Sequence, residues 1–362
     1  MDLKSTPLFE EHKRLGARLA PFAGWLMPIS YGSIIDEHKW SRSSASVFDI
    51  CHMGEFIISG KRAKKGLNRI LTMELDNMKD GTCHYGFMLN ERGGIIDDLI
   101  IYKINDNKWM IVVNAATTEK DEAHIKNHLP DGVRLENISN ILGKLDIQGP
   151  LSKEILKGFI GDGLEKLDYY TFSSFKILGD DNIISRTGYT GELGYEIYID
   201  NNKIIELWRR FLEDKRLKPA GLGARDTLRL EMAYPLYGQD ITEDTIPQEA
   251  NLSQFVDFKK DFIGKEALLK KKEKGIKRRL VCFKTDSRRA PRHNFKIYLD
   301  DKEIGIVTSG SFSPSLGCGI GMGYVEEGYD KEGTRITIKD GSTVITAIIQ
   351  DKPFYKEGSV RY

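Results

Sequence analysis

The sequence predicts an α+β protein that ends in a separate, smaller β-rich unit. Helical and strand-like patterns alternate through the first 277 residues, as in α+β units built on antiparallel sheet. From about residue 278 the pattern changes to short strands separated by turns. The chain has 362 residues, which is too long for one compact core, so two or three domains are expected.

The first 50 residues are predicted to form helical turns. Pro7 favours the start of a helix that runs to Leu15, and Ser33 is a good N-cap for a helix over residues 34–40. Thr117 or Thr118 is expected to cap a helix that ends near residue 128. The other expected helices are 63–71, 151–159 and 203–212, and the expected strands are 55–59, 95–102, 109–114, 144–148, 183–186 and 195–199.

A lysine-rich helix over residues 265–274 marks the boundary to the β-rich unit. Short strands at turn-separated intervals are typical of a small barrel or sandwich. The six expected strands are 280–284, 296–299, 304–309, 322–325, 335–338 and 344–349.

Composition argues against several classes of protein. A net charge of +1 is unsuited to general binding of nucleic-acid backbone, so no nucleic acid is expected as a partner. The chain has neither a signal-like leader nor an apolar stretch of about 18 residues, so no membrane association is expected. Four scattered cysteines without a CxxC pair predict free thiols and a cytoplasmic location.

Two adjacent aspartates, Asp97 and Asp98, interrupt an apolar run that follows Gly93-Gly94. In a strand, neighbouring side chains point to opposite faces, so one carboxylate can reach solvent while the other is buried. A buried carboxylate is destabilising unless it is paired or its pKa rises. The pair therefore predicts a site of chemistry, beside glycines that allow a ligand or backbone to approach closely.

Two further segments combine glycine with aromatic and charged residues. Three glycines within residues 186–196 predict a tightly folded loop, and Tyr189 and Glu196 favour a flat, hydrogen-bonding ligand over a plain hairpin turn. If residues 221–231 are helical, Arg225 and Arg229 share one face. These arginines either form ion pairs on an exposed helix face or bind a carboxylate-bearing substrate.

Other patterns are better explained by ordinary structure. Residues 317–323 lack the spacing of a dinucleotide fingerprint and favour a turn followed by a glycine-rich strand. His124 and His128 are four residues apart without an intervening glutamate, which favours a polar helix face. A zinc site made by residues 51–52 and 83–84 is disfavoured, because strand neighbours face opposite ways. No metal site is expected.

The chain resembles the aminomethyltransferase (T protein) family of the glycine cleavage system over nearly its whole length. No single motif would carry this resemblance, but their order and number make it specific. The matching segments are 6–9 with His12, 22–25, 27–28, 48–49, 52–55, 90–91, 93–99, 112–115, 148–150, 186–196, 221–231, 236–240, 261–267, 308–310 and 312–314.

The resemblance implies a cloverleaf of three domains around a central tetrahydrofolate site. Residues 1–277 would form two interleaved α+β domains, the second over roughly 54–140, and residues 278–362 the β-barrel. The implied reaction moves the methylene carbon of an aminomethyl group from the lipoyl arm of the H protein to tetrahydrofolate. Its products are 5,10-methylenetetrahydrofolate, ammonia and the dihydrolipoyl H protein, with the P and L proteins as indirect partners.

The resemblance also implies roles for individual residues. Asp98 matches the catalytic carboxyl group, and Glu196 matches the residue that hydrogen-bonds the pterin ring. Arg225 matches a folate-site arginine, and Arg361 a position that reaches back over the central site. The positions that match the lining of the pterin pocket are Met53, Tyr102, Val113, Asn114 and Tyr189.

The chain departs from the family at a few positions. Cys51 stands where serine is frequent, Asn251 and Asn294 stand where glycine is common, and Gly317-Cys318-Gly319 is unusual. Two alternatives stay open: another tetrahydrofolate-dependent demethylase on this scaffold, or a non-catalytic folate-binding protein. The second would carry a cysteine-containing signature around residues 236–240, which is absent here.

Overall fold

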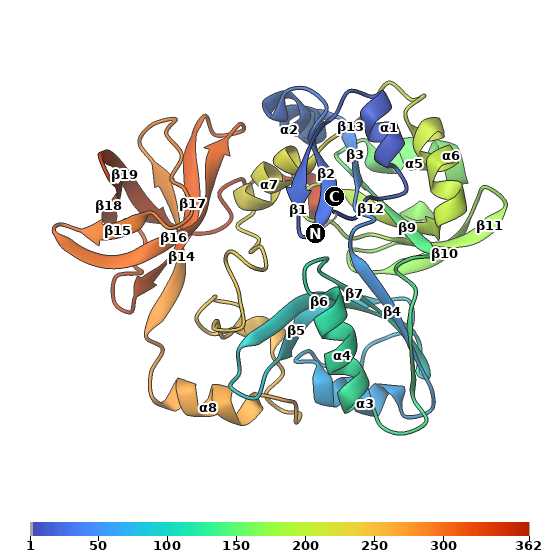
Figure 1. Cartoon of the computed structure of the whole chain (residues 1–362), viewed down its shortest axis with the longest axis horizontal. Helices are drawn as coiled ribbons and strands as arrows, with labels where there is room; N and C mark the ends of the chain where they lie inside the picture. The colour runs from blue at the N-terminus through green and yellow to red at the C-terminus, as the bar shows by residue number, and fades with distance from the viewer. Residues whose placement is uncertain (1–2, 362) are drawn as a thin grey trace.

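The computed structural model describes residues 3–361, with the backbone alone for Arg361. Three lobes surround a common centre (Figure 1). One lobe holds a six-stranded sheet, the second a five-stranded sheet and the third a closed six-stranded barrel. This architecture confirms the predicted α+β class with a C-terminal β-barrel. No helix in residues 3–361 is long and apolar enough to span a membrane.

The six-stranded sheet of the first lobe has the order β10-β11-β12-β9-β3-β13. Helices α5 (Ser152–Ile160) and α6 (Asn201–Phe211) pack on it and bury Ile155, Leu207 and Trp208 against its apolar face. The strands are β3 (Ala45–Asp49), β9 (Leu142–Gln148), β10 (Phe172–Ile177), β11 (Asp180–Ser185), β12 (Gly194–Asp200) and β13 (Leu217–Pro219).

The prediction of helical turns through the first 50 residues is only partly right. Helices α1 (Phe9–Arg14) and α2 (Ile34–Ser43) are present, and Ser33 Oγ accepts a hydrogen bond from the amide of Asp36 at 3.3 Å as the N-cap. Between them lies a hairpin of β1 (Arg18–Phe22) and β2 (Trp25–Ser30). Its two-residue turn, Ala23-Gly24, has positive φ at both positions, as primed hairpin turns require.

The second lobe is a five-stranded sheet in the order β5-β6-β7-β4-β8. Helix α4 has the bounds Thr118–His128, and Thr117 holds the N-cap position, but its side chain makes no capping hydrogen bond. The hydroxyls of Thr117 and Thr118 donate instead to Asn114 O at 3.0 and 3.1 Å. The remaining elements are β4 (Gly54–Ser59), β5 (Cys83–Leu89), β6 (Ile95–Asn105), β7 (Lys108–Val113), β8 (Arg134–Asn137) and α3 (Ala63–Ile70).

The third lobe is a barrel closed in the order β14-β17-β16-β15-β18-β19. Gly317 has a φ of +70° and precedes β17, which confirms a turn followed by a glycine-rich strand. Asn251 and Asn294 also have positive φ, at 56° and 71°, so asparagine here occupies the left-handed backbone that glycine adopts freely. The strands are β14 (Arg278–Thr285), β15 (Lys296–Leu299), β16 (Lys302–Ser313), β17 (Cys318–Glu326), β18 (Arg335–Asp340) and β19 (Thr343–Gln350).

Long connections tie the lobes together. Helix α7 (Leu222–Glu231) contacts β2 in the first lobe and β16 in the barrel, and α8 (Lys265–Glu273) precedes the barrel. Residues 351–360, called the tail segment below, leave the barrel and return to the first lobe. There the amide of Val360 donates to Gly191 O at 3.1 Å.

Candidate active site

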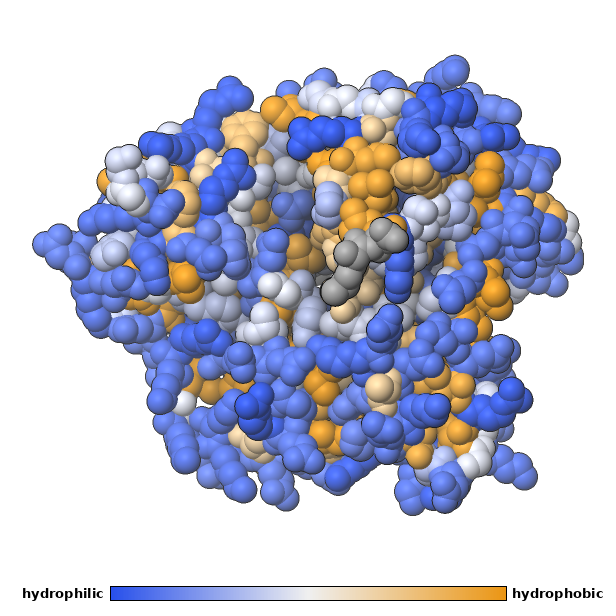
Figure 2. Space-filling model, in the orientation of Figure 1, coloured by the Kyte–Doolittle hydropathy of each residue, from blue (hydrophilic) through white to orange (hydrophobic). Residues whose placement is uncertain are grey.

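A cavity of about 1920 Å³ lies where the lobes meet. In Figure 2 the outer surfaces of the lobes are mostly hydrophilic, and hydrophobic side chains gather toward the middle of the molecule. Both α+β lobes, helix α7, the connection after it and the tail segment contribute to the lining. A space of this size exceeds the usual small-molecule pocket, so it has room for more than one ligand group.

Alternation along β9 and β12 gives the cavity its polar floor. On β9, Leu145 and Ile147 pack under the helices of the first lobe, so Lys144, Asp146 and Gln148 face the other way. Register places Glu196 of β12 directly opposite Asp146. Of these side chains, Lys144 and Glu196 line the cavity and are almost fully buried, and Asp146 lies on the same face beside them.

Glu196 is bound on one side and open on the other. Its Oε2 accepts hydrogen bonds from Thr187 Oγ1 at 2.6 Å and from Tyr102 Oη at 3.4 Å. Its Oε1 lies 3.4 Å from Lys144 Nζ. Burial alone would raise the pKa of Glu196, but the Lys144 ammonium and the Thr187 hydroxyl outweigh it and hold that pKa below its usual range. The carboxylate is therefore ionised and able to accept a further hydrogen bond.

The other cation of the cavity floor, Arg225, is already paired with a carboxylate of the protein. Arg225 of α7 donates through Nη1 to Asp146 Oδ2, and its guanidinium lies 5.2 Å from the ring centroid of Tyr189. Burial raises the pKa of Asp146 to about 6, against the lowering effect of Arg225. Nearby Glu55, which burial keeps largely protonated with a pKa of about 8, adds no further negative charge beside Glu196 and Asp146 at neutral pH.

Asp98 of β6 presents its carboxyl group to the same cavity. Tyr85 Oη donates to Oδ2 at 2.9 Å, and Asn114 Nδ2 donates to Oδ1 at 2.9 Å. Burial, reinforced by the negative charge of Asp97, raises the pKa of Asp98 to about 7, although both hydrogen bonds lower it. A carboxyl group that titrates near neutrality can both take up and release a proton.

The expectation of one buried and one accessible aspartate is confirmed. Asp97 is fully buried, and it accepts from the backbone and side-chain amides of Asn114 at 3.0 and 2.9 Å. Burial and the neighbouring Asp121 raise the pKa of Asp97 well above its usual value. Gly94, before the pair, allows another backbone segment to approach closely, because a Cβ at this position would lie 1.7 Å from Glu243 O.

The structure brings together six of the nine residues expected at the site. The side chains of Tyr102 and Val113 do not line the cavity: Tyr102 is fully buried behind Glu196, and Val113 lies in the core of the second lobe while its neighbour Val112 faces the cavity. The side chain of Arg361 lies outside the described part of the structure. The six residues that line the cavity are Met53, Asp98, Asn114, Tyr189, Glu196 and Arg225.

The glycine-rich loop of residues 186–196 packs tightly against protein rather than a ligand. A Cβ on Gly188 or Gly194 would lie within 2.2 Å of the Gln148 side chain. Tyr189 nevertheless lines the cavity, stacks on Tyr234 at 5.8 Å between centroids and donates its hydroxyl to Pro235 O. The loop thus places one aromatic ring at the site and fixes it at both ends.

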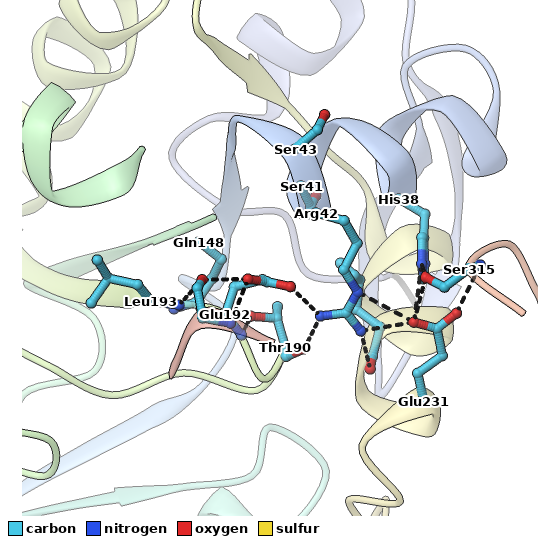
Figure 3. Close-up of polar contacts among 12 residues, drawn as sticks. His38, Ser41, Arg42, Ser43, Gln148, Thr190, Glu192, Leu193, Glu231 and Ser315 are labelled. Atoms are coloured by element: carbon cyan, nitrogen blue, oxygen red, sulfur yellow. Dashed lines mark hydrogen bonds and ion pairs between the residues drawn. The ribbon is translucent and has the colours of Figure 1, made fainter. Parts of the chain in front are cut away.

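A buried ion network holds the loop and the tail segment together (Figure 3). Arg42 of α2 donates to Glu192 Oε1 and Glu231 Oε2, both at 2.8 Å. Glu231 also accepts from Ser315 of the barrel at 2.9 Å. Glu192 accepts from the amide of Ser359 at 2.9 Å. One arginine therefore links three parts of the fold behind the cavity wall.

Several cavity residues were not predicted from the sequence. Lys144 and Tyr85 are the clearest, and His52 also lines the cavity, with no hydrogen-bond partner for its Nδ1. Burial lowers the pKa of His52 to about 4, so its ring is neutral. The polar alternation of residues 144–148 was the available signal for Lys144, whereas Tyr85 and His52 gave no pattern of their own.

Comparison with known proteins agrees with this architecture. Family models match residues 8–260 (GCVT N-terminal domain) and 278–356 (glycine cleavage T-protein C-terminal barrel domain). An aminomethyltransferase of Halothermothrix orenii is 47% identical over 97% of this chain and all of its own length. One from Caldanaerobacter subterraneus is 44% identical over 98% and 97% of the two chains.

A solved structure extends the agreement to three dimensions. The crystal structure of the glycine cleavage system aminomethyltransferase T from Bartonella henselae matches with a TM-score of 0.94 at 33% identity over 99% of both chains. The chain belongs to the glycine cleavage T-protein family. Within that family it is an aminomethyltransferase of the glycine cleavage system, a transferase of one-carbon groups.

Proposed function

We propose that the enzyme takes the methylene carbon of an aminomethyl group from the lipoyl arm of the H protein and transfers it to tetrahydrofolate. The products are 5,10-methylenetetrahydrofolate, ammonia and the dihydrolipoyl H protein. The observation that carries this proposal is the Asp98 carboxyl group, which faces the cavity with a pKa of about 7. That group stands opposite a floor of buried charges suited to a polar ring.

The residues of the cavity fit a reduced folate. Glu196 offers an ionised carboxylate whose Oε1 has only Lys144 nearby, and the N–H groups of a pterin ring are its natural donors. Tyr189 and Met53 supply aromatic and apolar surface for a flat ring. Arg225 and Asn114 complete the proposed binding set, together with Tyr102 and Val113 as supporting residues and Arg361 at the end of the tail segment.

Tetrahydrofolate would supply the nitrogen atoms that accept the one-carbon unit. Asp98 would hold or release a proton at Oδ1 or Oδ2 as the carbon changes partners, a role for which its pKa near neutrality is suited. Asn114 and Tyr85 fix the orientation of this carboxyl group through one hydrogen bond to each oxygen. Holding two reactants in one orientation contributes much of the rate in reactions of this kind.

The size of the cavity also favours a carrier-borne substrate. Its 1920 Å³ leave space for the lipoyl arm of the H protein beside the folate, and walls from several parts of the chain limit the access of water. The P and L proteins would act on the H protein rather than on this enzyme. Four cysteines, all free in the structure, favour the cytoplasm as the compartment.

A coupled assay tests the proposal. The purified enzyme is mixed with tetrahydrofolate and aminomethyl-loaded H protein, and product formation is followed with a methylenetetrahydrofolate dehydrogenase. Product that requires both the H protein and Asp98 supports the proposal. Tight binding of folate without product would instead favour a demethylase with another substrate, or a folate-binding protein without transfer activity.

A further inference from the structure

We infer that Lys144 determines specificity for the 4-oxo group of the pterin ring, by donating a hydrogen bond to that oxygen beside the carboxylate of Glu196. The inference rests on the proposed function, because it assigns a task within the same folate site. It concerns a buried ammonium group that the proposed reaction leaves without a role.

Lys144 is a charged side chain with few strong partners. Only 1% of its surface is exposed, yet it lines the cavity. Its Nζ lies 3.4 Å from Glu196 Oε1, 3.7 Å from Met53 Sδ and 5.0 Å from the ring centroid of Tyr198. No backbone carbonyl in residues 3–361 accepts a hydrogen bond from it. Its ammonium group is therefore paired far less closely than other buried charges of the site.

The Lys144 ammonium group has more N–H donors than strong acceptors around it. An ammonium group has three N–H donors. One is directed at a carboxylate at a long distance, and one at a thioether, which is a weak acceptor. At least one donor of Lys144 is left without a strong acceptor. A buried donor in that state is destabilising unless a ligand supplies the missing oxygen.

The two ends of the Lys144–Glu196 pair match one edge of a pterin. That edge presents a carbonyl oxygen at position 4 and N–H donors at N3 and the 2-amino group. Glu196 Oε1 can accept from the donors, and Lys144 Nζ, which lies beside it, can donate to the carbonyl. Arg225 is less suited to this oxygen, because Asp146 already engages its guanidinium.

Replacement of the 4-oxo group by an amino group changes two groups of this edge, because the carbonyl oxygen is lost and N3 also loses its hydrogen. The part of the preference that reports on Lys144 is therefore the part that disappears when Lys144 is replaced. The amino group brings N–H hydrogens toward the ammonium of Lys144, where no acceptor remains. Sites built to bond a particular polar group reject analogues that lack it by large factors. The wild-type enzyme should therefore bind folic acid at least roughly 10-fold more tightly than its 4-amino analogue aminopterin.

The experiment measures both dissociation constants by isothermal titration calorimetry at about pH 8, for the wild type and for Lys144→Met. In Lys144→Met the preference for folic acid should shrink by roughly 10-fold or more, through weaker folic acid binding and unchanged or tighter aminopterin binding. Lys144→Gln, which keeps an N–H donor, should retain part of the preference. Lys176→Met, an exposed change on β10 of the same sheet, should alter neither constant.

Other outcomes would refute either the role of Lys144 or the proposed function as a whole. Equal weakening of both ligands in Lys144→Met would make Lys144 a structural partner of Glu196 and refute the inference. Equal affinity of the wild type for both ligands would refute it even if Lys144→Met does not fold, while folate binding would stand. If the wild type bound neither ligand, and tetrahydrofolate did not bind either, the proposed function would fail together with the inference.

Discussion

Replacement of Asp98 by asparagine removes the ability of this side chain to transfer a proton and keeps its shape. The asparagine oxygen can accept from Asn114 as Oδ1 does now, and its amide can donate to the hydroxyl of Tyr85, which can rotate to accept. Folate affinity should therefore change by less than about threefold. The rate of transfer should fall by roughly 10²–10⁴, the usual contribution of a positioned acid or base.

The pKa of Asp98 also predicts how steeply the transfer rate changes with pH. With a pKa of about 7, an enzyme that needs the ionised carboxylate has about 10% of its sites active at pH 6 and about 90% at pH 8. The rate should thus rise nearly 10-fold over these two pH units. Tyr85→Phe removes a hydrogen bond that lowers this pKa, so the midpoint of the profile should move to higher pH.

Single-turnover measurements with aminomethyl-loaded H protein, with the coupling enzyme in excess at every pH, would report the transfer step. Folate binding by the Asp98→Asn variant would be measured in parallel. A flat wild-type profile between pH 6 and 8, or Asp98→Asn turnover within about threefold of the wild type, would refute the assignment of Asp98.

Three further variants test other parts of the structure. Glu196→Gln should weaken folate binding by roughly 10- to 100-fold in calorimetry, because a charge-assisted acceptor is lost; unchanged affinity would place the ring elsewhere. Gly94→Ala should destabilise by about 1–3 kcal/mol or more in urea unfolding, since its Cβ overlaps a backbone carbonyl, whereas Gly158→Ala in open space should gain about 0.5–1 kcal/mol. Arg42→Met should cost about 3–5 kcal/mol, because it removes the guanidinium shared by two buried carboxylates and leaves Glu192 with Ser359, and Glu231 with His38 and Ser315; a loss below about 1 kcal/mol would contradict this reading.

Sequence patterns predicted most of the fold because hydrophobic residues recur along many segments with the spacing of either a strand or a helix. The six barrel strands and helix α7 lie where alternation and helical spacing placed them. The hairpin of β1 and β2 was missed because its turn, Ala23-Gly24, has no strong turn pair such as Asn-Gly. Its strands are also half-exposed and contain prolines, which weakens any strand pattern.

The site was predictable only in part, for a physical reason visible on β9. Alternating Lys144, Asp146 and Gln148 look like the solvent face of an antiparallel strand. They are buried because the loop of residues 186–196 covers Gln148, Arg225 of α7 covers Asp146, and Lys144 faces the enclosed cavity. A local pattern shows which residues share a face, but not what covers it. The residue pattern singled out the Asp97-Asp98 pair and Glu196, and the resemblance to the family assigned roles to Asp98 and Glu196, while Lys144 required the three-dimensional arrangement.

The tail segment has a consequence for how the protein is made. Residues 352, 353, 355, 356, 358 and 360 line the cavity, and Ser359 binds Glu192 in a loop that is synthesised 167 residues earlier. Both α+β lobes are synthesised before this wall exists. The wall of the cavity is therefore complete only after residue 360 has been translated, so a prematurely terminated chain would lack this part of the cavity lining.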